Sequence, residues 1–192
     1  MYRCSVCQNE SNNKKFIARE LMFGYNDEFI YWECGNCKRL EIDRSPENLD
    51  KYYPTDKYYS FIGKNVYTDS PKSLKNRIEK LKYEFILSGK NKIAGHILSL
   101  YYKIPSFYEW IKISGVISSS TILDVGCGRG VLLNRFRKMG FTNLTGVDPF
   151  NKKNIEVKGM SIYNKTVFEI NGQYDFIMSH HSFEHMPEPE RH

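Results

Sequence analysis

The fold is decided by residues 121–130, which read TILDVGCGRG. Residues 122–125 are apolar apart from one aspartate, which is typical of a short buried strand. Three glycines follow at alternate positions, and they let the backbone approach a ligand with its N–H groups exposed. Residues 131–139 carry apolar side chains at helical spacing and end at Gly140. The stretch therefore predicts a strand, a glycine turn and a helix, which together are half of a nucleotide-binding crossover unit.

The spacing of the glycines narrows the choice of ligand. A dinucleotide fingerprint would need a glycine where Val131 stands, and a P-loop would need Gly-Lys followed by Ser or Thr, which is absent. A second predicted strand, residues 144–147, ends in Asp148, 18 residues after Gly130. A carboxylate in that position can accept hydrogen bonds from both hydroxyls of a ribose. These parts fit an adenosine that carries no phosphates.

Three stretches together resemble the class I S-adenosylmethionine-dependent methyltransferases over about residues 116–192. They are the glycine stretch itself, GVD at residues 146–148, and YDFIMSHHSFEHMPEP at residues 174–189. The resemblance implies an α/β fold with a Rossmann-like sheet. It also implies that S-adenosylmethionine is the cofactor. Carried across residue by residue, the cofactor-binding positions are Asp124, Gly126, Gly128, Gly130, Asp148 and Ser179.

The resemblance implies a role for each of these positions. The three glycines would surround the methionine end of the cofactor, and Asp124 would orient its amino group. Asp148 would hold the ribose, while Ser179 and His180 would lie near the transferred methyl group. For a hydroxyl acceptor the protein must also supply a base. The candidates are His180, His181 and His185, although His185 has an alternative structural role as a helix-start residue bonded to backbone.

The family's sheet has seven strands, and the last three follow the segment that ends this sequence. We therefore expect a partial sheet of about four parallel strands, with the fourth strand at an uncovered edge. Either the chain is a truncated piece of a longer protein, or another chain supplies the missing strands in an oligomer. We expect such a chain to bind cofactor weakly and to turn over little.

Four of the five cysteines form two Cys-x-x-Cys pairs, Cys4 with Cys7 and Cys34 with Cys37. Two such turns can arrange four thiolates tetrahedrally at about 2.3 Å from Zn²⁺. Because the protein would fill all four positions, the zinc would be structural and would stabilise a ribbon too small for its own core. A redox pair would be expected at a helix start, whereas residues 29–33 read as a strand. Disulfides are disfavoured in a reducing compartment.

Three domains are predicted: a zinc ribbon at residues 1–45, an aromatic connector with basic helices at 46–115, and the cofactor-binding part at 116–192. Within the connector, residues 70–103 hold eight basic and two acidic side chains, which account for the net charge of +6. Helices are expected over 70–89, 93–104 and 106–113. The basic face of these helices is either solvated surface or a surface that attracts an anionic partner.

Three functions remain open. The first is methyl transfer to a small molecule such as a sugar or glycan precursor, because the paired cysteines and the tyrosines at 52–53 and 58–59 are similar to a bacterial subgroup linked to polysaccharide methylation. The second is methylation of RNA gripped by the ribbon and the basic helix. The third is a non-catalytic interaction module. The sequence lacks a signal peptide and any apolar run long enough to cross a membrane, which favours the cytoplasm.

Overall fold

The computed structural model describes residues 2–54 and 106–186, together with Tyr67, Ile78, Leu81, Phe85 and Ile97. The chain divides after residue 54 into two compact units, and each is described here by itself.

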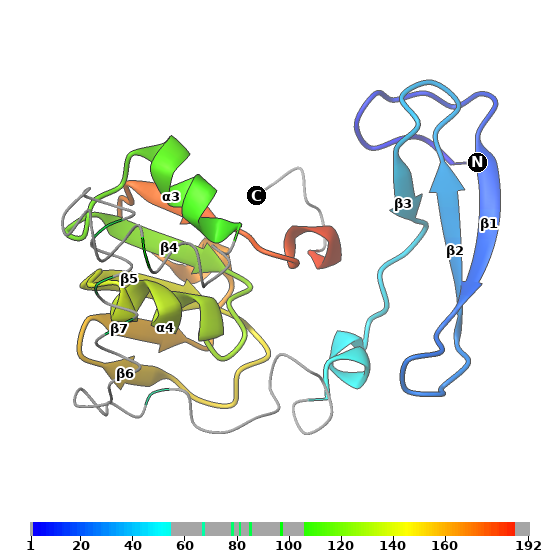
Figure 1. Ribbon diagram of the computed structural model, residues 1–192. Helices are drawn as coiled ribbons and strands as arrows, with labels where there is room; N and C mark the ends of the chain where they lie inside the picture. The colour runs from blue at the N-terminus through cyan, green and yellow to red at the C-terminus, as the bar shows by residue number, and fades with distance from the viewer. Residues whose placement is uncertain are drawn as a thin grey trace. The chain divides into compact units, whose positions relative to one another are not determined.

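The first unit is a small antiparallel sheet (Figure 1). Its strands are β1 (Lys14–Arg19), β2 (Glu28–Glu33) and β3 (Leu40–Ile42), in that spatial order. A single 3-10 turn, η1 (Leu49–Tyr52), follows. The prediction of a strand immediately before Cys34 is confirmed.

Little apolar surface is buried within the first unit. Among residues 2–54 only Cys4 and Cys34 are fully buried, both with 0% of their surface exposed. Tyr2 stacks on Trp32 with ring centroids 5.1 Å apart. A unit of this size with so small a core needs an additional cross-link to fold stably.

The second unit contains a five-stranded sheet in the order β6-β7-β5-β4-β8 (Figure 1). Four strands are parallel and β6 is antiparallel to its neighbour. This confirms the predicted α/β class with a partial, Rossmann-like sheet of four parallel strands. The strands are β4 (Thr121–Val125), β5 (Asn143–Val147), β6 (Ile155–Val157), β7 (Met160–Tyr163) and β8 (Phe176–Met178).

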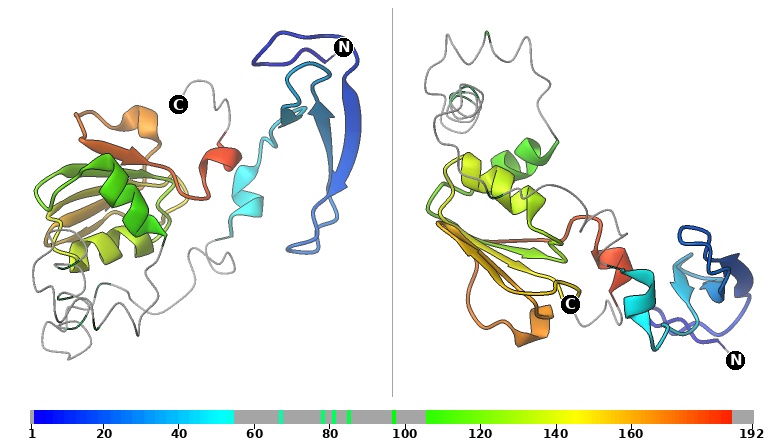
Figure 2. Two further views of the ribbon diagram at one scale, coloured as in Figure 1. Left: turned by 45° about the horizontal axis from the view of Figure 1, so that its top comes forward. Right: turned by 90° about the horizontal axis from the view of Figure 1, so that it is seen from below.

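Two helices, α3 (Phe107–Ser114) and α4 (Val131–Lys138), cover one face of this sheet (Figure 2). Their apolar side chains form the main core with residues that alternate along the strands. The largest fully buried members are Ile111, Ile122, Leu133, Phe136, Phe141 and Ile162. Both helices were predicted, α3 at residues 106–113 and α4 at 131–139.

The opposite face carries a smaller cluster of Leu123, Val125 and Val147. A short 3-10 turn, η2 (Val167–Glu169), lies on this side of the sheet (Figure 2). Among the described residues β8 pairs only with β4, and Ile177 in β8 has 60% of its surface exposed. The strand therefore lies at the edge of the described sheet, as expected.

The two helices predicted over 70–89 and 93–104 fall largely outside the described residues. Ile78, Leu81, Phe85 and Ile97, which belong to those segments, are each helical. In the part of the chain that is described, no helix is both long and apolar enough to cross a bilayer.

Candidate functional site

The glycine turn follows β4 directly and leads into α4. Gly126 donates its N–H to the Val147 carbonyl at 2.8 Å, which ties the turn to the end of β5. Gly130, the N-cap of α4, has a φ of +69°, and a Cβ there would lie 2.2 Å from Cδ1 of Ile162. Glycine suits this position, because a side chain would be strained at this φ and its Cβ would have to displace Cδ1 of Ile162 in β7.

Asp148 lies at the carboxyl end of β5, against the glycine turn. Its side chain accepts hydrogen bonds from the Gly128 N–H at 2.8 Å and from the Phe150 N–H at 2.9 Å. The residue is 7% exposed, and this burial raises the pKa of its carboxyl although the two N–H groups act to lower it. The structure thus brings Asp148 to the turn, as its sequence position predicted.

Asp124 is more deeply buried, with 2% of its surface exposed. Burial and, after it, the negative charge of Asp148 raise the pKa of the Asp124 carboxyl to about 8. No side-chain hydrogen bond or ion pair joins Asp124 to another described residue. A buried carboxyl without a partner is costly. A cationic or hydrogen-bond-donating ligand at the turn would relieve that cost.

The segment after β8 is tied to the start of the glycine turn by two hydroxyl groups. Ser182 Oγ donates to the Val125 carbonyl at 2.6 Å and lies 2.8 Å from Ser179 Oγ. A Cβ on Gly126 would lie 2.3 Å from Cβ of Ser182. Ser179, at the end of β8, therefore belongs to the same small region as the turn.

The three candidate histidines all follow β8 and are all exposed. The His180 ring packs on Trp110 of α3 with centroids 5.1 Å apart, and the His181 ring meets that of His180 edge-on at 4.3 Å. His185 ends the short 3-10 turn η3 (Phe183–His185), and its N–H donates to the Ser182 carbonyl at 3.0 Å. The half-buried ring of Trp110 and the exposed rings of His180 and His181 form one side-chain group, and His185 lies a few residues further along the chain.

Four contacting residues were not identified from the sequence: Ser182, Trp110, Asn151 and Tyr67. Asn151 Nδ2 donates to the Gly128 carbonyl at 2.8 Å, and Tyr67 Oη donates to the Arg129 carbonyl. None of them belongs to a motif with a fixed spacing. Only the polar turn that follows Asp148 offered a signal for Asn151.

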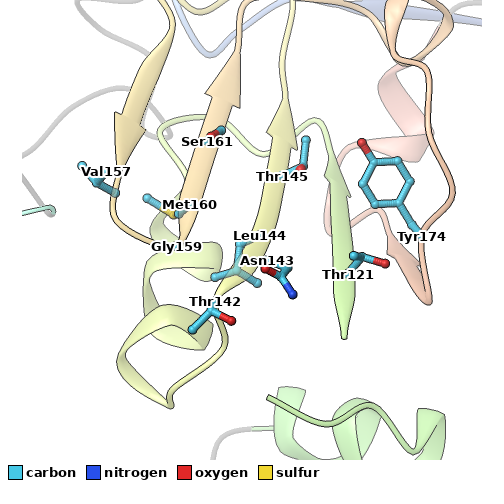
Figure 3. A pocket seen from close by; sticks show the side chains of 10 residues that line it. All are labelled: Thr121, Thr142, Asn143, Leu144, Thr145, Val157, Gly159, Met160, Ser161 and Tyr174. Atoms are coloured by element: carbon cyan, nitrogen blue, oxygen red, sulfur yellow. The ribbon is translucent and has the colours of Figure 1, made fainter. Parts of the chain in front are cut away.

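An open depression of about 270 Å³ lies elsewhere on the sheet (Figure 3). Its lining includes the first residues of three parallel strands, which are Thr121, Asn143 and Met160. In α/β sheets ligands bind at the carboxyl ends of parallel strands, where the glycine turn is. The depression is therefore separate from the candidate cofactor site.

The four paired cysteines converge in the first unit. Their sulfur atoms all lie within 4.8 Å of one another, with Cys4 Sγ 3.7 Å from Cys37 Sγ and Cys7 Sγ 3.4 Å from Cys34 Sγ. A tetrahedron with metal–sulfur bonds of ~2.3 Å has sulfur–sulfur edges of ~3.8 Å. Disulfide bonds would need ~2.05 Å. The four sulfurs could thus hold a zinc ion, and all four cysteines are free thiols.

The two cysteine turns have the same backbone. Gln8 N–H donates to the Cys4 carbonyl at 3.0 Å, and Lys38 N–H donates to the Cys34 carbonyl at 3.1 Å. Gln8 and Lys38 each follow the second cysteine of a pair, with φ of 61° and 63°. Two equivalent turns aim two sulfurs each at one point, as the paired spacing predicted.

The protonation of these thiols shows why a cation suits them. Burial raises the pKa of Cys34, but N–H groups of Cys37 and Asn36 outweigh it and lower the pKa to about 6. The Arg39 N–H lowers the pKa of Cys37, yet burial and the neighbouring sulfurs raise it to about 12. Four thiolates cannot coexist here without a positive charge, which a divalent metal would supply.

Comparison with known proteins bears on the second unit. Residues 105–192 match a family model described as a methyltransferase domain. No curated protein and no solved structure matched the chain. The match spans the glycine turn, Asp148 and the segment after β8. Together with the parallel sheet, it supports a class I methyltransferase domain in this part of the chain.

Proposed function

We propose that the chain binds S-adenosylmethionine at the glycine turn and transfers its methyl group to a small molecule, a sugar or glycan precursor. The observation that carries the proposal is the pair of buried carboxyl groups beside the turn. Asp124 has no hydrogen-bond partner among the described residues, and its pKa is raised to about 8. A ligand that brings hydroxyl donors and positive charge suits such a pair.

Each residue then has a defined task. The glycines Gly126, Gly128 and Gly130 let the backbone surround the methionine end, and Asp124 orients the amino group. Asp148 accepts hydrogen bonds from the ribose hydroxyls, and Ser179 lies near the reacting centre. The bound cofactor would supply an activated methyl group. The protein's contribution is to hold donor and acceptor in line and to exclude competing water.

The segment after β8 supplies the candidates for a base. An imidazole nitrogen of His180, His181 or His185 would take the proton of an acceptor hydroxyl. The ring of Trp110, packed on His180, offers an apolar face beside these bases. This apolar face is the structural feature that supports a sugar as the acceptor, and the same acceptor is expected from the cysteine pairs and tyrosines of the N-terminal half. We propose that a neutral or anionic small molecule is the partner and that the reaction takes place in the cytoplasm.

In the first unit we propose one structural zinc ion held by Cys4, Cys7, Cys34 and Cys37. The metal would cross-link a unit in which only Cys4 and Cys34 are fully buried among residues 2–54. With all four ligands from protein, no position is left for water or substrate.

The test is to incubate the zinc-loaded protein with S-adenosylmethionine labelled in its methyl group, nucleotide-linked sugars and total RNA. Label in the sugar fraction supports the proposal. Label in RNA would favour the nucleic-acid alternative. Saturable cofactor binding without transfer to either pool would favour the non-catalytic module, and no binding would refute the cofactor assignment.

A further inference from the structure

The Gly128 backbone is held at two points by side chains of the turn that follows β5. Its N–H donates to Oδ2 of Asp148, and its carbonyl accepts from Nδ2 of Asn151, each at 2.8 Å. Both hydrogen bonds are buried, and Asn151 is 6% exposed. A buried amide of this kind must keep its partner, because its loss leaves polar groups unsatisfied.

Asp148 and Asn151 are also joined through the backbone of their own turn. The backbone N–H of Asn151 donates to the Asp148 carbonyl at 3.3 Å, and the Phe150 N–H donates to Oδ1 of Asp148 at 2.9 Å. Residues 148–151 therefore form one tight turn, whose Asp148 carboxylate and Asn151 amide both hydrogen-bond to the backbone of Gly128. Neither side chain can rotate without breaking a buried hydrogen bond.

We propose that Asn151 is a positioning residue for cofactor binding. It holds the Gly128 carbonyl and thereby keeps both the glycine turn and the Asp148 carboxylate in their binding orientation. Each oxygen of Asp148 accepts one backbone N–H, which fixes the carboxylate plane and leaves acceptor capacity for ribose hydroxyls. The trans peptide also directs the Arg129 N–H opposite to the held carbonyl. This inference rests on the proposed binding of S-adenosylmethionine.

The first test is calorimetric titration of S-adenosylmethionine into Asn151→Ala and the nearly isosteric Asn151→Asp, which puts an acceptor where the donor was. We expect affinity to fall by about tenfold in each, the effect of one buried hydrogen bond. Asn143→Ala is the matched control, since Asn143 Nδ2 also donates to a backbone carbonyl, that of Ser119 at 2.7 Å, at the amino end of β5. Its affinity should equal that of the wild type.

A second readout separates positioning from general loss of stability. Asn151 and Asp148 both hold the backbone of Gly128, one at its carbonyl and the other at its N–H, so their effects on affinity should be far from additive when Asn151→Ala and Asp148→Ala are combined. Exchange of the Gly128 amide hydrogen should also accelerate in Asn151→Ala, while thermal unfolding shows whether the variant stays folded.

The outcomes are distinguishable. Wild-type affinity in folded Asn151→Ala and Asn151→Asp, or strictly additive losses with Asp148→Ala, would overturn the role of Asn151 while leaving cofactor binding intact. If the wild type binds no S-adenosylmethionine, the proposed function itself fails, and the role of Asn151 fails with it.

Discussion

Asp124 and Asp148 are buried acidic side chains that act on each other beside the glycine turn. Burial and then the negative charge of Asp148 raise the pKa of Asp124 to about 8. The Asp148 carboxylate accepts two backbone N–H groups, whereas Asp124 has no such partner among the described residues. The Asp148 carboxyl group is thus held by two backbone N–H groups and the Asp124 carboxyl group by none, and the first two predictions depend on this difference.

Stability should decrease as pH rises, because of Asp124. The pKa of Asp124 in the folded protein is about 8, above its ordinary value of 3.8. At pH values between these two, the folded state therefore binds more protons than the unfolded state. The free energy of unfolding should therefore fall from pH 4 to pH 8 by up to about 1.4 kcal/mol per pH unit. Urea unfolding at several pH values should show that the free energy of unfolding depends less steeply on pH in Asp124→Asn than in the wild type. Identical slopes in the two proteins would contradict the assignment.

Cofactor binding should release a proton below pH 7. Asp124 is mostly protonated there when free, and a bound cation favours its ionised form. The affinity for S-adenosylmethionine should rise between pH 5.5 and 7 by up to about tenfold per pH unit. Titration in two buffers of different ionisation enthalpy measures the released proton. Asp124→Asn should abolish this release, and a wild type that releases none would count against Asp124 as a cofactor contact.

Gly130→Ala should destabilise the second unit through a clash with Cδ1 of Ile162. Gly115→Ala is the matched control, because φ is +68° there and +69° at Gly130, but a Cβ at Gly115 meets nothing within 4 Å. Thermal unfolding should show Gly130→Ala less stable than Gly115→Ala by about 1–3 kcal/mol. Adding Ile162→Val, which removes Cδ1, should recover part of that difference. Equal losses in the two single variants would mean that the turn is not packed on β7.

The first unit should depend on one bound metal ion. We expect one zinc per chain by elemental analysis. In Cys34→Ser we expect loss of the zinc and of the first unit's share of the β-sheet signal, because a small metal-held unit unfolds without its ion. Cys127→Ser is the control, since Cys127 lies in the glycine turn and should leave the zinc content unchanged. A full zinc content in Cys34→Ser would show that this cysteine is not a ligand.

The local elements of the fold could be predicted because their signals lie within a few residues. An apolar run followed by alternate glycines predicts β4, the turn and α4, and the two-residue cysteine gap predicts the paired turns. The contact of Ser182 with the Val125 carbonyl joins residues 57 positions apart, and no sequence motif of fixed spacing predicts it. The same holds for Asn151 on Gly128 and for Trp110 on His180. The contacts of Ser182 and Asn151 follow from the register of parallel strands, which brings their carboxyl ends together only after the sheet has formed. The contact of Trp110 depends on the packing of α3 beside the sheet.

The central claim is that the glycine turn and Asp148 hold S-adenosylmethionine, and one calorimetric comparison tests it most directly. The cofactor affinity of Asp148→Ala is compared with that of the control variant Asp175→Ala. Asp175 also accepts a hydrogen bond from a backbone N–H, that of Thr121 at 2.7 Å, but it lies at the amino ends of the strands. We predict that Asp148→Ala binds the cofactor at least about tenfold more weakly than wild type, with Asp175→Ala unchanged. Equal cofactor affinity in wild type and folded Asp148→Ala would contradict the account.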